Sequence, residues 1–364
     1  MRQLEKLKVL IVDNSIFYRK ILSRAVAETG LGQVAHTASN AVLALERLEQ
    51  HETDVVLLDM SIPGMKCLET MEKIRKEHPA VFVVMLSAGS AKKTADTIMA
   101  LEIGAWDFIP KPPALNAEKH VENIKNRLQG LFAQIMTRKY TSPAADVLTV
   151  AESAPAYRPA PKKQLSGVDL VVIASSTGGP AALEDIFKNL PAAFNKPVLV
   201  VQHMPAGLTK KLAFSLNKKC QLPVIEAAEG DPVKPGRVMI APGGFHMTVQ
   251  PGSNGDIIIK LASTPPVNGV RPAADVLFHS VAANCRGKRI LAVILTGMGS
   301  DGLSGIEEMK KTCDCYCLTQ SEKTCTVYGM PKNVVDAGLS DRTEDLNAIP
   351  ARLLQIVSGR SLGS

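Results

Sequence analysis

Two blocks of short apolar runs, each run followed by a helix-like amphipathic stretch, constrain the fold of this chain more than any other feature. Near-continuous apolar runs separated by helices are typical of parallel strands that are buried on both faces. The blocks cover about residues 6–129 and 167–358, and the chain between them is rich in proline and alanine. At 364 residues the chain is also long for a single domain. The sequence therefore predicts two α/β domains joined by a linker.

The first domain is predicted over residues 1–129. Five apolar runs are expected to be its strands: LKVLIV from Leu7, QVAHT from Gln33, DVVLLD from Asp54, VFVVML from Val81 and WDFI from Trp106. The stretches between these runs have the helical period. Five such units suit a doubly wound domain with a five-stranded parallel sheet.

The linker is predicted within residues 130–166, where a helix ends and Arg138–Ser166 combines four prolines with no sustained period. We expect it to let the domains move relative to each other.

Residues 167–358 form the second predicted domain, and residues 359–364 a short tail. The expected strands of the second domain are DLVVIAS, PVLVVQH, RVMIAP, FHMTVQ, DIIIKL and RILAVILT. FHMTVQ and DIIIKL flank a Pro-Gly-Ser-Asn-Gly turn, so we expect a mixed, mostly parallel sheet with one hairpin.

Composition narrows the class of protein. Hydrophobic residues make up 46% and charged residues 21%, as in soluble globular proteins. The apolar run near the N-terminus is too short for a signal peptide, and no run approaches the ~18 residues of a membrane span. We therefore expect a cytoplasmic protein without membrane insertion. The net charge of +7 is too diffuse, and aromatics at 4% too few, to indicate nucleic acid binding. The mild positive charge of the second half favours an acidic partner.

Seven cysteines, an odd number in a chain without an export signal, argue against a disulfide framework. Cys313, Cys315 and Cys317 alternate, which places three thiols on one face of a strand. Zinc ligands are usually spaced two to four residues apart on turns. Small buried core residues are the favoured interpretation, and a metal site is the alternative.

Polar side chains follow four strands of the first domain, namely Asp13 and Asn14, Asp59, Ser87 and Lys111. Ligands of open α/β sheets bind beyond the carboxyl ends of the strands. Two carboxylates beside a hydroxyl and an ammonium suit a Mg²⁺-assisted phosphoryl site. Helix capping by the residues after the first strand is the alternative, but it leaves the other three strand ends unexplained.

The motifs LIVDNS, LLDMSIPGM, MLSA and FIPKP resemble response-regulator receiver domains over about residues 6–129. This resemblance implies that Asp59 is the phosphoacceptor and that Ser87 and Lys111 contact the phosphoryl group. It also implies that Asp13, Asn14 and Asp59 hold Mg²⁺. The family usually has a second acid at the position of Asn14, and an amide is a weaker Mg²⁺ ligand than a carboxylate.

The second domain ends three predicted strands with a different set of groups: Ser176, His203 and Asp301. A serine whose proton is taken by an imidazole, itself oriented by a carboxylate, attacks esters well. The segment STGGP then opens a helix whose unpaired amides can stabilise an oxyanion. Nucleotide binding is a weaker interpretation because STGGP matches neither phosphate-binding glycine motif. Capping explains a serine or threonine here but not His203 and Asp301.

The motifs IASSTGGP, VQHMPAGLT, VNGVRPAADVLF, LTGMGSDG and VYGMP resemble the catalytic domain of chemotaxis protein-glutamate methylesterases, the CheB family. The resemblance implies that Ser176 is the nucleophile, His203 the general base and Asp301 the residue that orients it. It also places Thr177 beside the nucleophile and makes the Met298 amide an oxyanion donor. The implied reaction is hydrolysis of glutamate γ-methyl esters on chemoreceptor helices, with deamidation of receptor glutamines.

The combined expectation is a phosphorylation-regulated serine-type esterase with a chemoreceptor substrate and a phosphodonor kinase of the CheA type. Mg²⁺ belongs to the receiver domain, and ester hydrolysis needs no cofactor. The alternative is a response regulator whose second domain is a non-catalytic binding module. Where the family commonly has Gly-Ala before the serine, this chain has Ala174-Ser175, so the register with STGG selects Ser176.

Overall fold

The computed structural model describes residues 5–63, 65–88, 91–111, 117–141, 167–253 and 256–359. These residues form two compact units, one within residues 1–154 and one within residues 155–364. Most of the predicted linker, most of the predicted tail and part of the hairpin turn lie outside the described residues. Among the described residues, no helix has the length and apolar character needed to cross a membrane.

The first unit is built on a five-stranded sheet of order β2-β1-β3-β4-β5, in which every pairing is parallel. Its strands are β1 (Leu7–Val12), β2 (Gly32–Ala38), β3 (Val55–Asp59), β4 (Phe82–Ala88) and β5 (Asp107–Lys111). Each coincides with a predicted apolar run to within a few residues. The strand order reverses between β1 and β3, so the residues that follow these two strands flank the crevice where such sheets bind ligands.

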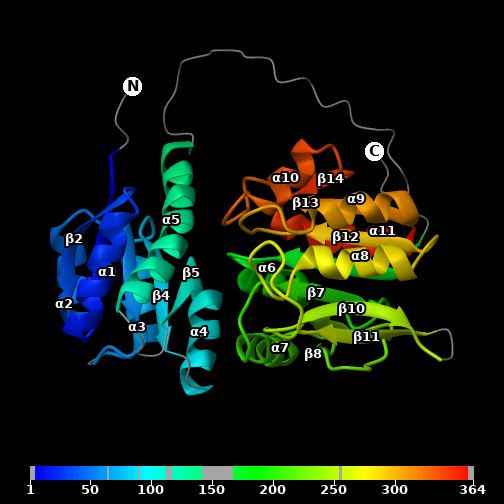
Figure 1. Cartoon of the computed structure of the whole chain (residues 1–364), viewed down its shortest axis with the longest axis horizontal. Coiled ribbons are helices and arrows are strands. Elements are labelled where there is room, and N and C mark those ends of the chain that lie inside the picture. The colour runs from blue at the N-terminus through cyan, green and yellow to red at the C-terminus, as the bar shows by residue number, and fades with distance from the viewer. Residues whose placement is uncertain are drawn as a thin grey trace, which may run out of the picture. The chain divides into compact units, whose positions relative to one another are not determined.

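Helices cover both faces of this sheet (Figure 1), and they are α1 (Ile16–Glu28), α2 (Ala41–Gln50), α3 (Cys67–Glu77), α4 (Ala91–Ile103) and α5 (Ala117–Thr141). Helices α1 and α5 contact each other, whereas α3 contacts α2 and α4. Helix α5 therefore passes the predicted domain boundary at residue 129.

The prediction that the linker begins at Arg138 is wrong, because α5 continues to Thr141. Contacts with residues just before β3 and β5 explain the extra turn. The Arg138 guanidinium lies 5.4 Å from the centre of the Trp106 ring, and Lys139 Nζ is 2.6 Å from Asp54 Oδ1. Neither Trp106 nor Asp54 is near in sequence, so the periodicity of the helix alone could not predict these contacts.

The second unit is built on a seven-stranded sheet of order β14-β13-β12-β6-β7-β9-β8. Its strands are β6 (Leu170–Ser175), β7 (Val198–Gln202), β8 (Val224–Glu226), β9 (Val238–Ile240), β12 (Arg289–Ile294), β13 (Asp314–Gln320) and β14 (Arg342–Glu344). All six pairings are parallel. The strand order reverses between β6 and β12, so the ends of these two strands flank the crevice.

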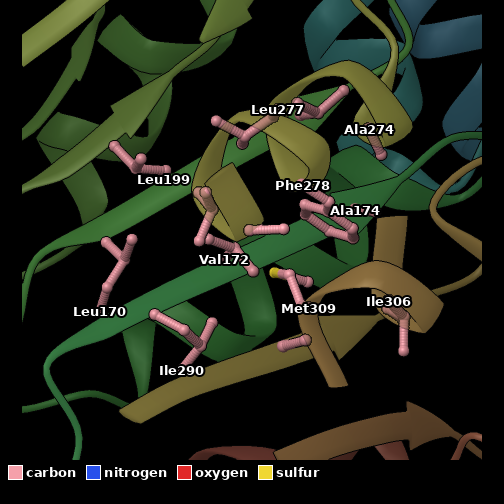
Figure 2. Packing of buried hydrophobic residues seen from close by; sticks show 14 of the residues in the cluster. Leu170, Val172, Ala174, Leu199, Ala274, Leu277, Phe278, Ile290, Ile306 and Met309 are labelled. Atoms are coloured by element: carbon pink, nitrogen blue, oxygen red, sulfur yellow. The ribbon is translucent and has the colours of Figure 1, made fainter. Parts of the chain in front are cut away.

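Alternation along β6 divides its side chains between two layers. Leu170, Val172 and Ala174 point into a core with Leu277 and Phe278 of α8, and Ile306 and Met309 of α9 close it (Figure 2). These helices are α8 (Ala274–Asn284) and α9 (Leu303–Thr312). The other layer holds α6 (Gly179–Lys188), α7 (Leu208–Lys219) and α11 (Ile349–Ser358), with α6 contacting both of the others. The remaining helix, α10 (Met330–Asp336), lies against α9 and β13.

The predicted hairpin is confirmed as β10 (His246–Pro251) and β11 (Ile257–Ala262), which pair antiparallel. It forms a separate two-stranded sheet that packs on α8. The expectation of a mixed main sheet is therefore wrong in this detail, because the hairpin lies beside the parallel sheet instead of joining it.

The three alternating cysteines lie in and just before β13, and their side chains are part of the buried core with α8 and α9. Burial raises the pKa of the Cys313 and Cys317 thiols. The Cys313 thiol donates to the carbonyl oxygen of Cys285 at 3.2 Å. These cysteines thus pack as small apolar side chains, which is the favoured interpretation of their pattern.

Candidate active site

The first unit brings Asp13, Asp59, Ser87 and Lys111 to the carboxyl edge of its sheet, as the sequence predicts. Lys111 Nζ lies 2.5 Å from Asp13 Oδ2 and 2.9 Å from Asp59 Oδ1. The Lys111 ammonium is also 4.5 Å from the centre of the Tyr18 ring. Ser87 Oγ accepts a hydrogen bond of 3.0 Å from Thr97 Oγ1. One ammonium therefore bridges two carboxylates that come from neighbouring strands.

The electrostatics of Asp59 fit a cation site. Both carboxylate oxygens are buried, and Lys111 Nζ lies 2.9 Å from Oδ1. Burial raises the pKa of Asp59, and the positive charge of Lys111 only partly opposes this effect. Within the described residues, no three His, Cys, Asp or Glu side chains converge on a metal position. Two carboxylates with water nevertheless suit Mg²⁺, which keeps several waters in most protein sites. Asn14 is exposed beside Asp13.

In the second unit, Ser176 and His203 follow β6 and β7 at matching positions. Ser175 and Gln202 are partners in the β6–β7 ladder, so the next residue of each strand lies at the same edge. The His203 amide donates to the Ser175 carbonyl at 3.1 Å, and Gln202 Nε2 donates to the Ser176 carbonyl at 2.9 Å. The sheet itself therefore places the serine beside the imidazole.

The glycines of STGGP allow the chain to turn closely over this edge. Gly178 has φ +79, a left-handed conformation that favours glycine, and a Cβ there would lie 2.3 Å from Thr326 Oγ1. A Cβ on Gly179 would lie 1.9 Å from Gln202 Oε1. These positions therefore serve a tight turn into α6.

The two adjacent serines have different environments. Ser175 is fully buried, and its hydroxyl donates to Gln202 Oε1 at 2.6 Å. Ser176 is partly exposed, and its amide donates to the Thr296 carbonyl at 3.0 Å. Among the contacts of the described residues, no hydrogen bond joins Ser176 Oγ to the His203 ring. Serine–base bonds often tighten only when substrate is bound. Only Ser176 is thus both accessible and held at the sheet edge.

His203 and Asp301 form a direct pair, with His203 Nε2 2.7 Å from Asp301 Oδ2. Both side chains are almost fully buried. Asp301 Oδ2 also accepts from the Ala274 amide at 2.6 Å, and Oδ1 accepts from the Asp275 amide at 3.0 Å. Burial opposes ionisation of this carboxyl, but the bonds from His203 and the two amides outweigh it and lower the pKa of Asp301. Asp301 is therefore an ionised acceptor for the ring.

The segment Gly297-Met298-Gly299 passes directly over Ser176. A Cβ on Gly297 would lie 2.8 Å from Ser176 Cβ, and the Gly297 carbonyl accepts from the Met330 amide at 2.8 Å. The Met298 amide has no acceptor among the described residues. Thr177 is buried next to the serine, and its carbonyl accepts from Thr296 Oγ1 at 2.9 Å. An unused amide beside a serine can bind an oxyanion.

Three further polar residues of the sequence have structural contacts here. The His246 ring is fully buried, accepts from the Ala273 amide at 3.1 Å and lies 3.1 Å from the Pro265 carbonyl. Arg271 donates to the carbonyls of Ser263 and Thr264. The exposed His279 contacts Ser304 Oγ. None of the three contacts the serine.

Asn268 and Asp275 are two polar residues of this site that the sequence does not predict. Asn268 donates to Asp301 Oδ1 at 2.9 Å and to Asp275 Oδ2 at 2.8 Å. The asparagine–glycine pair in VNGVRPAAD signals a turn, but nothing in its spacing to Asp301 predicts a contact across 33 residues.

A serine, an imidazole and a carboxylate from three strand ends can carry out acyl transfer through a covalent intermediate. The first unit instead has two carboxylates, Asp13 and Asp59, at the carboxyl ends of its strands. The two sites together define a two-domain α/β protein, in which a receiver-type unit is followed by a unit of the serine hydrolase type.

Comparison with known proteins agrees. Residues 171–353 match the CheB methylesterase family model, and residues 9–122 match the response regulator receiver domain model. The chain therefore belongs to the CheB methylesterase family. It is 38% identical to a protein-glutamate methylesterase/protein-glutamine glutaminase of Desulfotalea psychrophila, over 97% of this chain and 99% of that one. A protein of the same name from Geobacillus kaustophilus is 36% identical over 97% of this chain and 99% of that one.

A solved structure is also similar to the second unit. The CheB methylesterase catalytic domain of Thermotoga maritima is 42% identical, with a TM-score of 0.50 over 52% of this chain and 100% of that one. The fold class expected from the sequence, with a five-stranded receiver unit and a mostly parallel α/β unit that has a hairpin, is confirmed.

Proposed function

We propose that this chain hydrolyses glutamate γ-methyl esters on cytoplasmic helices of chemoreceptors, releasing methanol, and that it also deamidates receptor glutamines. The observation that carries the proposal is the ionised Asp301 carboxylate 2.7 Å from His203 Nε2, at the sheet edge that holds Ser176. The names of the relatives over nearly the full chain support the substrate class. We further propose that the protein acts in the cytoplasm, where these receptor helices lie.

In this proposal Ser176 Oγ attacks the ester carbonyl while the His203 ring takes its proton. Asp301 holds the ring and stabilises its positive charge. The oxyanion is stabilised by the Met298 amide, and Thr177 shapes the turn beside it. The ring then gives its proton to the ester's methoxide oxygen, which leaves as methanol. In the second half of the reaction the ring takes a proton from water, the water oxygen attacks the Ser176 ester, and the proton passes to Ser176 Oγ as the glutamate is released. Deamidation follows the same course with ammonia as the leaving group.

The receiver unit is proposed to regulate this activity. Asp59 accepts a phosphoryl group from a histidine kinase of the CheA type, and Ser87 and Lys111 bind the phosphoryl oxygens. Asp13, Asp59 and Asn14 would hold Mg²⁺, which neutralises charge on the carboxylates and on the incoming phosphoryl group. The buried Asp59 oxygens, which lie beside Lys111 and next to the strand that leads to Asp13, support this assignment.

We expect the full chain to release methanol from methylated receptors and a small-molecule phosphodonor to raise the rate at least severalfold. Phosphorylation adds negative charge at Asp59 and so changes the contacts of Lys111 and Ser87. We expect this local change in the receiver unit to alter the activity of the second unit. Methanol is measured from receptors carrying a labelled methyl group. Asp59→Asn is the control, since it keeps basal release but loses the stimulation. If wild type releases no methanol under any condition, the second unit is a binding module.

Residue 14 tests the proposed Mg²⁺ ligands. Asn14→Asp adds a hard anionic oxygen and should tighten Mg²⁺ binding by about tenfold, which equals ~1.4 kcal/mol. Asn14→Ala should not tighten it. Calorimetric titration of the full chain is the measurement. The fluorescence of Trp106 would report Mg²⁺ binding poorly, because Trp106 lies just before the start of β5 and Lys111 is at its end. Wild-type affinity equal to or above that of Asn14→Asp would show that residue 14 is not a ligand.

A further inference from the structure

Asn268 lies between two buried carboxylates. Its single Nδ2 donates to Asp301 Oδ1 at 2.9 Å and to Asp275 Oδ2 at 2.8 Å. An amide nitrogen carries two protons, so each carboxylate receives one. Asp275 is buried like Asp301, and burial together with the nearby Asp301 charge raises the pKa of Asp275, which its hydrogen bonds oppose. Without a donor between them, the two negative charges would repel each other at close range.

The two acids also bind each other's helices. Asp301, just before α9, accepts from the Ala274 and Asp275 amides at the start of α8. Asp275, in the first turn of α8, accepts from the Gly302 and Gly305 amides at the start of α9, at 3.0 and 2.8 Å. Each carboxylate is thus stabilised by the amino end of the other helix, where unpaired amides favour negative charge. This exchange fixes the segment that carries Asp301.

We infer that Asn268 and Asp275 are positioning residues for the hydrolytic reaction, which hold the Asp301 carboxylate in the place and orientation that align the His203 ring. The inference rests on the proposed function and extends it beyond the three expected catalytic groups. It follows from the different contacts of the two Asp301 oxygens. Oδ2 contacts the His203 ring, whereas Oδ1 accepts hydrogen bonds from Asn268 and from the Asp275 amide. Rotation of the carboxylate away from the ring would break these bonds.

The backbone at Asn268 is suited to this task. Its φ of +54 lies in the left-handed region, where asparagine and glycine are favoured among the twenty residues. The segment that carries it is anchored at both ends. Arg271 binds the carbonyls of Ser263 and Thr264, and the buried His246 ring contacts Ala273 and Pro265. The Asn268 side chain is therefore delivered to the carboxylates by a fixed loop.

The same backbone conformation provides matched variants. Asn268→Gly removes the amide and keeps a residue that tolerates the left-handed backbone. Asn268→Asp keeps the shape but replaces the donor by a third negative charge. Ser263→Ala on the same loop is the control, because only its backbone carbonyl takes part in the contacts.

We expect Asn268→Gly to lower kcat for methanol release by about 10- to 100-fold with little change in KM, since a misplaced catalytic group costs about this much. Asn268→Asp should be slower still. Its acidic limb in the kcat/KM profile should move to higher pH, because added negative charge keeps the imidazole protonated over a wider range. The other titratable groups facing this region are Asp275 and His279 of α8, and His246 of β10. None of these is altered in the two variants.

A second readout does not depend on turnover. The ring proton between His203 Nε2 and Asp301 should give a downfield proton resonance in the wild-type full chain. It should weaken or move upfield in Asn268→Gly and remain in Ser263→Ala. An unchanged resonance, with unchanged kcat and pH profile in both Asn268 variants, would overturn the inference. A changed resonance in a chain that releases no methanol would keep the positioning role and instead reject the proposed function.

Discussion

Replacing Ser176 by alanine is expected to lower the rate of methanol release by about 10⁵- to 10⁶-fold, the loss typical of removing a triad nucleophile. Ser176 is partly exposed at the edge where His203 and the Met298 amide lie, so its hydroxyl is the one that can reach an ester. Initial rates with labelled receptors measure the effect. The variant should fold normally, because no hydrogen bond of the Ser176 hydroxyl is lost among the described contacts.

Ser175→Ala is the matched control for this prediction. The buried Ser175 hydroxyl donates to Gln202 Oε1, so its loss leaves an unpaired oxygen and should cost about 1–3 kcal/mol of stability. The rate should fall by no more than about tenfold, because no step of the reaction uses this hydroxyl. If Ser175→Ala abolished release and Ser176→Ala did not, the nucleophile would be the wrong serine.

Asp301→Asn is expected to lower kcat by about 10⁴-fold, as the loss of an orienting carboxylate does in other serine hydrolases. Four donors converge on this carboxylate when His203 Nε2 carries its proton. An asparagine has only one acceptor oxygen, so its NH₂ group must face donors in either orientation. The ring then loses both its orientation and the charge that stabilises its protonated form.

Thermal unfolding separates this loss of catalysis from a loss of fold. The pKa of Asp301 is lowered in the folded chain, so its charge stabilises the fold above the usual carboxyl range, and this contribution is lost as the pH falls. Wild type should thus be more stable than Asp301→Asn near pH 7, and the difference should shrink in acid. Asp256→Asn, at an exposed carboxyl, is the control. A rate close to that of wild type would rule out Asp301 as the orienting group.

The sequence predicts the sheet strands better than the edges of the fold. The apolar run LKVLIV coincides with β1, because a strand buried on both faces is nearly continuously apolar. The three-residue strands β8 and β14 were missed, since so few residues show no period. The short helix α10 and the C-terminal α11 were also missed. Helix α5 is longer than predicted because contacts with Trp106 and Asp54 stabilise its last turn.

The site was predictable where a strand places its residues and not where loops meet. Ser176, His203 and Asp13 directly follow strands, so topology alone brings each to the carboxyl edge. Asn268 comes from the loop after the hairpin, and its contact with Asp301 depends on the packing of α8 against α9. The contacts of Arg271 show the same limit, because the loop backbone carbonyls of Ser263 and Thr264 that it binds carry no sequence signal.

The most direct test of the account is methanol release from one preparation of methylated receptors by wild type and Ser176→Ala, each with and without phosphodonor and Mg²⁺. The account predicts release by wild type, faster release with the phosphodonor, and no release above background by Ser176→Ala in either condition. Equal release by both proteins would contradict Ser176 as the nucleophile. If wild type bound the receptors but released no methanol, the claim that this protein is a methylesterase would be contradicted.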